Sequence, residues 1–167
     1  DSVTPDNFFF TENDLAAYAV KHYNFTTHEG FNAGIWKNDN ATDNQAATDY
    51  DKKWIPGQWK VPEAYDNPAS NDPWYFSTIR EANYFLETVV PRFEKGEIEG
   101  SETNIKHYIG EMYFLRAKNY LSKLETFGDF PIIKNTLPDE SESLIQASKR
   151  APRYKVAHFI LEDPDQA

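Results

Sequence analysis

The sequence contains no cysteine among its 167 residues. This absence excludes disulfide bonds, thiolate metal ligands and a thiol nucleophile. It does not indicate a compartment, because secreted bacterial proteins also often lack cysteine. The sequence also has no apolar run near the roughly 20 residues that a membrane-spanning helix requires. Disulfide-stabilised scaffolds and thiol-dependent enzymes are therefore set aside.

Basic residues are few. The chain has 17 lysine and arginine residues against 27 aspartate and glutamate residues, which gives a formal net charge of −10. No basic run offsets this acidity, so a surface that follows a phosphate backbone is not expected. We predict that nucleic acid is not a partner.

Aromatic residues, in contrast, are abundant. Twelve Phe, ten Tyr and four Trp make up 16% of the chain. A chain of this length suits one domain that buries about 70% of its unfolded surface. Several of the aromatic residues lie in polar sequence and not on helical stripes, which suggests a surface for flat ligands.

Helical patterns occur at three places before residue 130. A capping-box pattern at Thr11 and Asp14 predicts a first helix over residues 12–23. Apolar spacing predicts a second helix over residues 73–93 and a long third helix that contains residues 105–124. Gly128 and Pro131 predict that the long helix stops there. Arg116 interrupts its apolar stripe, and we expect a structural ion pair at this position.

The remaining segments have weaker patterns. Residues 25–74 show little periodicity and predict a long, aromatic-rich loop insertion, with a short helix near residues 46–54. After Pro131 we expect a short extended piece, a polar loop over residues 139–143 and a last helix that opens at Pro152. Asp129, in the turn after the long helix, is expected to satisfy backbone groups of that turn. The apolar face of that helix carries Val156, Phe159 and Ile160. We expect this face to be open.

Four blocks of this sequence resemble the SusD/RagB family of starch-utilisation-type outer-membrane lipoproteins. The blocks are TPDNFFFTENDLAAYAVKHYN (residues 4–24), IREANYFLE (79–87), EMYFLRAKNYLSKLETFGDFPII (111–133) and APRYKVAHFILEDPDQA (151–167). The resemblance implies an all-α fold of tetratricopeptide-like helix pairs with long inserted loops, an α-α superhelix. It further implies that residues 1–167 are the N-terminal portion of a longer single-domain protein.

The family resemblance also implies a function. Members of this family sit on the extracellular face of the outer membrane through a lipid anchor and bind glycans such as starch-like oligosaccharides. They deliver the ligand to a SusC-like TonB-dependent transporter and do not catalyse a reaction. The implied partners are thus a nutrient ligand, the transporter and the remaining C-terminal part of the same protein. No cofactor and no metal ion are expected.

Sugar recognition requires flat aromatic faces that stack on a pyranose ring, with amide, carboxylate and guanidinium groups that bridge its hydroxyl groups. Residues 25–74 supply both kinds of side chain, and the nearest matches to the family's site are Asp43, Asn44, Asn71 and Trp74. The full set of candidate ligand-binding residues is Trp36, Asp43, Asn44, Trp54, Trp59, Tyr65, Asn71 and Trp74. For each aromatic residue the alternative is that it anchors the loop onto the helices.

Two other interpretations remain open. An enzyme would require a pair of carboxyl groups with separated pKa values, as in glycoside hydrolysis, and no acidic residue stands in an apolar context that marks a general acid. A tetratricopeptide-like domain that binds another protein, with no sugar site in this segment, is the main alternative to glycan binding.

Overall fold

The computed structural model describes residues 8–23, 41–42, 44–46, 55–63, 69 and 72–166. The chain divides into two compact units, Asp1–His22 with Pro62–Ala167, and Tyr23–Val61. The first unit, called the helical unit below, holds all the α-helices of the described residues, and the fold is all-α as predicted. Among the described residues no helix is both long and apolar enough to span a membrane.

The first helix, α1, spans Glu12–Val20 and begins as its sequence predicts. Thr11 Oγ1 accepts a hydrogen bond from the Asp14 backbone N–H at 3.2 Å, and Asp14 Oδ2 accepts from the Thr11 N–H at 3.0 Å. This reciprocal pair is a capping box with aspartate in the place of glutamate. The helix ends three residues before the predicted residue 23.

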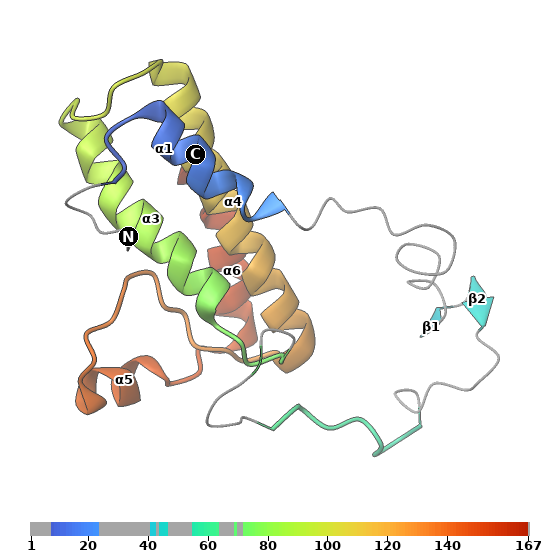
Figure 1. Ribbon diagram of the computed structural model, residues 1–167. Coiled ribbons are helices and arrows are strands. Elements are labelled where there is room, and N and C mark those ends of the chain that lie inside the picture. Colours follow the sequence, from blue (N-terminus) through green and yellow to red (C-terminus); the bar gives the residue numbers. More distant parts are fainter. Residues whose placement is uncertain are drawn as a thin grey trace. The chain divides into compact units, whose positions relative to one another are not determined.

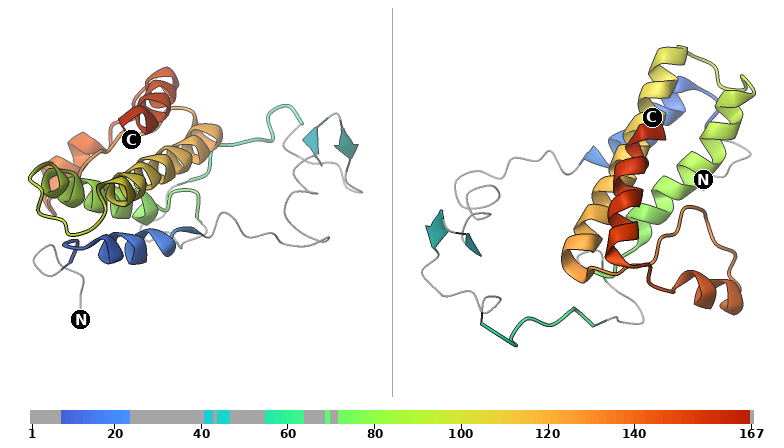
Figure 2. Two further views of the ribbon diagram at one scale, coloured as in Figure 1. Left: turned by 90° about the horizontal axis from the view of Figure 1, so that it is seen from above. Right: turned by 180° about the vertical axis from the view of Figure 1, so that it is seen from behind.

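The helices α3 (Ser77–Glu94) and α4 (Glu102–Phe127) form the centre of the helical unit. They run antiparallel and pack along their lengths, and α6 lies beside α4 (Figures 1 and 2). The helix α3 starts four residues later than the predicted residue 73, because residues 73–76 form the turn that leads into it. Pro91 is accommodated in the last turn of α3.

The long helix stops where Gly128 was predicted to end it. Gly128 has a φ of 72° and its N–H donates to the Leu124 carbonyl at 2.9 Å, which closes the helix with a left-handed residue. Asp129 Oδ1 then accepts from the Arg153 N–H at 2.7 Å. Asp129 therefore satisfies a backbone donor, but this donor belongs to the first residue of α6 and not to the turn in which Asp129 lies.

The helix α6 spans Arg153–Glu162, directly after Pro152 as predicted, and is followed by a short 3-10 helix, η3, over Pro164–Gln166. Between α4 and α6 lies α5, Ser141–Ala147, in place of part of the predicted polar loop. Two backbone hydrogen bonds between Phe130 and Ala151, of 3.1 and 3.0 Å, close the base of the segment that carries α5. None of the residues of α5 is buried.

An aromatic core joins α3, α4 and α6. Tyr120 and Phe159 contact edge to face with ring centroids 4.9 Å apart, and Phe127 stacks on Phe130 at 5.3 Å. The buried members of this cluster are Ile79, Tyr120, Phe127, Phe130, Val156 and Phe159. The prediction of an open face at Val156, Phe159 and Ile160 is therefore wrong. The stripe packs on α4, and Tyr154 and Leu161 are the exposed apolar residues of α6.

A second apolar cluster holds α1 on the helical unit. Phe9 is fully buried, and its ring contacts Tyr18 at 5.1 Å and Phe85 at 5.3 Å between centroids. Phe9 has a left-handed φ of 71°, a conformation that costs about 1–2 kcal/mol for a residue with a side chain. Burial of a whole phenylalanine ring, worth roughly 1.5–3 kcal/mol, offsets this cost.

Arg116 is buried in an ion pair, as predicted. Its Nε and Nη2 donate to Asp163 at 2.7 and 2.5 Å, and its Nη1 donates to Asn83 Oδ1 at 2.9 Å and to the Lys134 carbonyl at 3.2 Å. The side chains of Arg116 and Asp163 are only 6% and 4% exposed. The contact is a two-bond fork, which is the geometry that best compensates for burying both charges.

In the second unit the structure describes a small antiparallel ladder. The strands β1 (Ala41–Thr42) and β2 (Gln45–Ala46) pair Ala41 with Ala46 and Thr42 with Gln45. Apart from Ala46, which lies in β2, the short helix predicted near residues 46–54 falls outside the described residues. The loop insertion predicted over residues 25–74 stays a prediction for the same reason.

The buried ion pair gives a first prediction. We expect Arg116→Met to lower the free energy of unfolding by about 3–5 kcal/mol, because it leaves the Asp163 carboxylate buried without a partner. The matched control is Lys155→Met on the exposed side of α6, which should change the free energy of unfolding by at most about 0.5 kcal/mol. Denaturant unfolding followed by circular dichroism measures both. Equal effects of the two variants would contradict the structural role of Arg116.

A second prediction concerns His22, which is buried at the end of α1. Its Nε2 makes no hydrogen bond, although Glu81 Oε2 lies 3.5 Å away. Burial lowers the pKa of His22, and this effect outweighs the opposing influence of Glu81; Lys21 also lowers it. The unfolded chain keeps the ordinary value near 6.5. It therefore binds the proton first, and stability should fall as the pH drops through 6.5 and below.

Unfolding midpoints between pH 8 and pH 5 would measure this loss. His22→Gln should reduce the loss of stability between pH 7 and pH 5, whereas His158→Gln, at an exposed position on α6, should leave that loss unchanged. A decline that is the same in both variants would show that other groups cause it.

Candidate functional site

Trp74, the residue nearest to the family's aromatic position, lies in the turn before α3. Its ring packs against Phe127 at 4.2 Å and against Phe130 at 5.8 Å between centroids. Its Nε1 donates to the Pro62 carbonyl at 2.8 Å, and its backbone N–H donates to Asp72 Oδ1 at 2.7 Å. The ring thus joins the aromatic core and ties the turn to the helices, which is the anchoring role weighed above.

A cation also covers the Trp74 ring. The guanidinium carbon of Arg150 lies 5.1 Å from the ring centroid. Lys123 Nζ supports the same turn by donating to the carbonyls of Pro73 and Tyr75 at 2.5 and 2.8 Å. Partial burial lowers the pKa of Lys123, against a smaller raising effect of Asp72. A sugar that stacks on Trp74 would therefore have to displace the Arg150 side chain.

Trp59 and Asn44 belong to the second unit, and both are exposed. Trp59 is 53% accessible and presents ring surface to solvent. The other sequence-predicted site residues, Trp36, Asp43, Trp54, Tyr65 and Asn71, lie outside the described residues. The roles of these residues as ligand contacts stay predictions.

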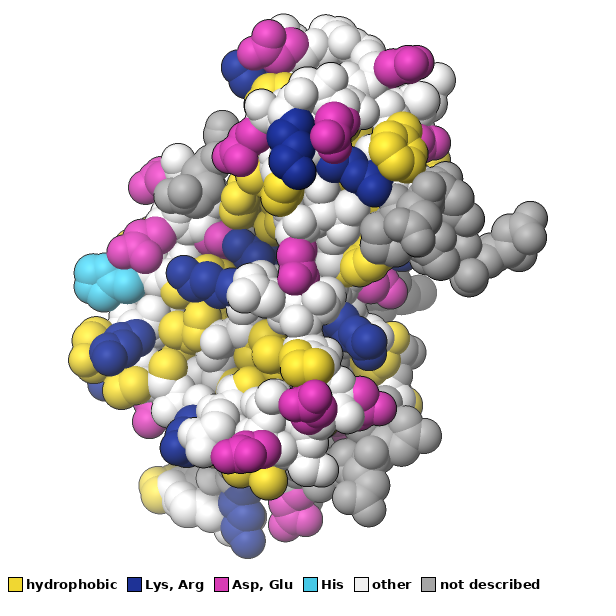
Figure 3. Space-filling view, turned by 90° about the vertical axis from the view of Figure 1, so that its left-hand side faces the viewer, with side chains coloured by type: hydrophobic (Ala, Val, Ile, Leu, Met, Phe, Trp, Pro, Cys, Tyr) yellow, Lys and Arg dark blue, Asp and Glu magenta, His cyan; other side chains and the backbone are white. Residues whose placement is uncertain are grey.

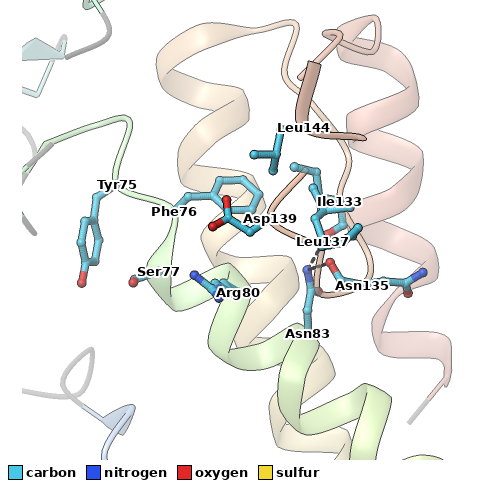
Figure 4. A pocket seen from close by; sticks show the side chains of 11 residues that line it. Tyr75, Phe76, Ser77, Arg80, Asn83, Ile133, Asn135, Leu137, Asp139 and Leu144 are labelled. Atoms are coloured by element: carbon cyan, nitrogen blue, oxygen red, sulfur yellow. Dashed lines mark hydrogen bonds between the residues drawn. The ribbon is translucent and has the colours of Figure 1, made fainter. Parts of the chain in front are cut away.

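A pocket of about 590 Å³ opens in the helical unit instead (Figure 4). Three segments form it: the start of α3, the extended stretch after Pro131, and α5. Its lining consists of Tyr75, Phe76, Ser77, Arg80, Asn83, Ile133, Asn135, Leu137, Pro138, Asp139 and Leu144. The volume is in the range of small-molecule sites, which is roughly 300–1,000 Å³.

Hydrogen bonds fix one wall of this pocket. Asn83 is almost fully buried and donates from Nδ2 to the carbonyls of Ile133 and Asn135 at 2.8 and 3.4 Å. Tyr120 Oη accepts from the Ile133 N–H at 2.8 Å and donates to its carbonyl at 3.1 Å. Burial raises the pKa of Tyr120 to about 12, so this hydroxyl keeps its proton at neutral pH. Residues 133–135 are therefore held on α3 and α4.

One further contact extends this wall. Glu87 Oε2 accepts from the backbone N–H and the hydroxyl of Thr136 at 2.9 and 2.6 Å. Beyond Thr136 the lining is less constrained, because α5 buries none of its residues and contributes Leu144 from an exposed position. The pocket thus has a fixed wall on α3 and an exposed rim at α5.

Polar groups in the pocket are available for a ligand. The side chains of Arg80, Asn135 and Asp139 are exposed and make no hydrogen bond or ion pair with the described part of the chain. The aromatic residues Tyr75 and Phe76 add apolar surface, and Tyr75 stands at the outer edge of the group in Figure 4. A guanidinium, an amide and a carboxylate beside aromatic surface can bind a molecule that has hydroxyl groups on an otherwise apolar ring.

Sequence reasoning missed this pocket. Tyr75 directly follows Trp74 in the sequence, so the aromatic pair was visible, but only the tryptophan was selected. Arg80 lies one turn into α3, where an arginine is ordinary helix surface. Asn135 and Asp139 come from a segment some 55–60 residues further along the chain. No local motif joins them to α3, because a buried hydrogen bond from Asn83 makes that connection.

The face of the molecule in Figure 3 shows no broad field of one charge. Lysine and arginine side chains alternate there with aspartate and glutamate, and exposed apolar side chains lie between them. Within the described residues, no three His, Asp or Glu side chains are grouped as a metal site would require. Recognition on this face would thus rest on individual contacts and not on a general electrostatic field.

Comparisons of the chain with models of known families, with curated proteins and with solved structures found no match.

The two described tryptophans give a third prediction. Trp74→Ala should lower the free energy of unfolding by about 3 kcal/mol, because it removes a ring from the aromatic core. Trp59→Ala should cost at most about 1 kcal/mol, because more than half of that side chain is exposed. Chemical unfolding of both variants would test this contrast. A larger loss in Trp59→Ala would contradict the anchoring role of Trp74.

Proposed function

We propose that this chain is the glycan-binding part of a SusD/RagB-like lipoprotein on the extracellular face of the outer membrane. In this proposal it captures an oligosaccharide and delivers it to a SusC-like TonB-dependent transporter. The observation that carries the proposal is the pocket at the start of α3, where aromatic surface lies beside unpaired guanidinium, amide and carboxylate groups. The four sequence blocks that resemble the family also support it.

The composition of the pocket suits binding better than hydrolysis. Glycosidases commonly flank the scissile bond with two carboxyl groups, about 5–10 Å apart. Among its described lining residues the pocket has one carboxylate, Asp139, and that residue is exposed. Asp139 and Asn135 instead offer planar groups that can each bridge neighbouring hydroxyl groups of a sugar. We therefore propose a binding protein and not an enzyme.

The helices themselves support a scaffold role in this proposal. The block at residues 111–133 supplies Arg116, Tyr120 and Phe127, all of which are buried. These three side chains therefore serve packing, and in this proposal the ligand contacts come from the segments around the block. Of the two described tryptophans, Trp59 in the second unit is the more exposed.

A second candidate function is a tetratricopeptide-like domain that binds another protein. The observation that favours it is a set of large apolar side chains left exposed on two packed helices. These are Phe114 and Leu121 on α4 and Tyr154 and Leu161 on α6, exposed by 50%, 44%, 59% and 70%. Exposed apolar surface of this kind is common at protein interfaces.

Calorimetric titration of the protein with a panel of oligosaccharides tests the proposal. We expect at least one glycan to bind, and Tyr75→Ala to weaken that binding by about 1 kcal/mol, roughly fivefold, through the loss of an aromatic face. Tyr154→Ala, which removes an exposed tyrosine outside the pocket, is the matched control. Trp59→Ala and Trp74→Ala test the sequence-predicted residues in the same titration.

Three outcomes separate the alternatives. Loss of affinity in Tyr75→Ala alone would support the pocket. Loss in Trp59→Ala alone would move the site to the second unit. Absence of binding to the whole panel would contradict glycan binding and favour the protein-interaction function.

A further inference from the structure

We propose that the pocket at the start of α3 selects a sugar unit that bears a carboxylate, such as a uronic acid within an oligosaccharide. This inference rests on the proposed glycan-binding function and adds the chemical class of the ligand. The residue that carries it is Arg80, the one cationic side chain among the described residues that line the pocket.

Arg80 is exposed, whereas the two other arginines of α3 and α4, Arg92 and Arg116, are partly or fully buried and paired. Arg116 donates to Asp163, Asn83 and Lys134, and Arg92 donates to the Phe8 carbonyl at 2.6 Å. Arg80 has no such contact with the described part of the chain, and its side chain extends from α3 among the other lining residues in Figure 4. A guanidinium presents a planar fork that matches the two oxygens of a carboxylate.

The beginning of α3 strengthens the attraction for an anion at this position. Phe76 at the N-cap provides no side-chain hydrogen bond to the first turn, and that turn contains no acidic residue. Phe76 and Ser77 both line the pocket, and Arg80 follows Ser77 by one turn. The partial positive charge of the helix start therefore adds to the charge of the guanidinium.

Asp139 limits which anion can bind. This carboxylate lies in the same lining, and the chain as a whole has a formal charge of −10. Both features oppose a ligand of high negative charge such as a polyphosphate. A uronic acid unit carries one carboxylate for Arg80 and several hydroxyl groups that can donate to Asp139 and Asn135. The carboxylate of such a unit thus suits the Arg80 guanidinium, and its hydroxyl groups suit the polar groups of Asp139 and Asn135.

The test compares an acidic oligosaccharide with its carboxyl-reduced neutral counterpart, which differs only in the carboxylate. Oligogalacturonate and the derived oligogalactoside are one such pair. We expect the acidic form to bind at least tenfold more tightly in low salt, and this preference to shrink as salt is raised. Arg80→Gln should abolish the preference, and Arg80→Lys should retain part of it. Arg153→Gln, at an exposed position outside the pocket, should preserve it fully.

Equal affinity for the acidic and neutral forms would overturn this inference and leave the proposed glycan binding intact. The same conclusion follows if Arg80→Gln and Arg153→Gln retain equal preferences. Failure of both forms and of all other glycans to bind would overturn the inference together with the proposed function. Circular dichroism of each variant verifies that the fold is preserved.

Discussion

The buried pair of Arg116 and Asp163 is the contact on which the helical unit depends. Arg116 lies on α4, and Asp163 directly follows α6, so the two-bond fork joins the end of the described chain to its central helix. The same guanidinium orients Asn83 on α3 by donating to its Oδ1. Because Asn83 then uses its Nδ2 on residues 133 and 135, one cation fixes three helices and a wall of the pocket.

Aromatic packing adds an apolar contribution to the contacts that hold α3, α4 and α6 together. Tyr120 belongs to the aromatic core and to the hydrogen-bond network, because its ring contacts Phe159 while its hydroxyl bonds to the backbone of Ile133. Trp74 extends the cluster to the turn that precedes α3. The turn that leads into the pocket is therefore anchored by rings that face the core. This explains why the aromatic residue most suggestive of a ligand site from sequence is largely used for folding.

Local sequence patterns correctly predicted the start of α1 at the Thr11–Asp14 capping box, the end of α4 at Gly128 and the start of α6 after Pro152, because caps depend on a few neighbouring residues. The end of α1 and the start of α3, which lack such a signal, were predicted three and four residues away from their observed positions. The helix α5 and the burial of Phe159 could not be predicted in this way. A seven-residue helix without buried side chains leaves no apolar stripe to read, and which face of α6 is covered depends on α4. The pocket was missed for the same reason, because its lining meets only through tertiary contacts.

The polar side chains of α3 differ in their pairing: some form hydrogen bonds with the rest of the chain, whereas Arg80 lines the pocket without a partner in the described part of the chain. At Asn83 and Glu87 the helix uses its polar side chains to hold residues 133–136. At Arg80, one turn nearer the helix start, the neighbouring polar side chain remains unpaired in the pocket lining. Arg80 and Asp139 are both exposed, and an ion pair between exposed side chains would add little stability. In the proposed function, a guanidinium and a carboxylate that line one pocket without an ion pair leave both charges able to contact a ligand.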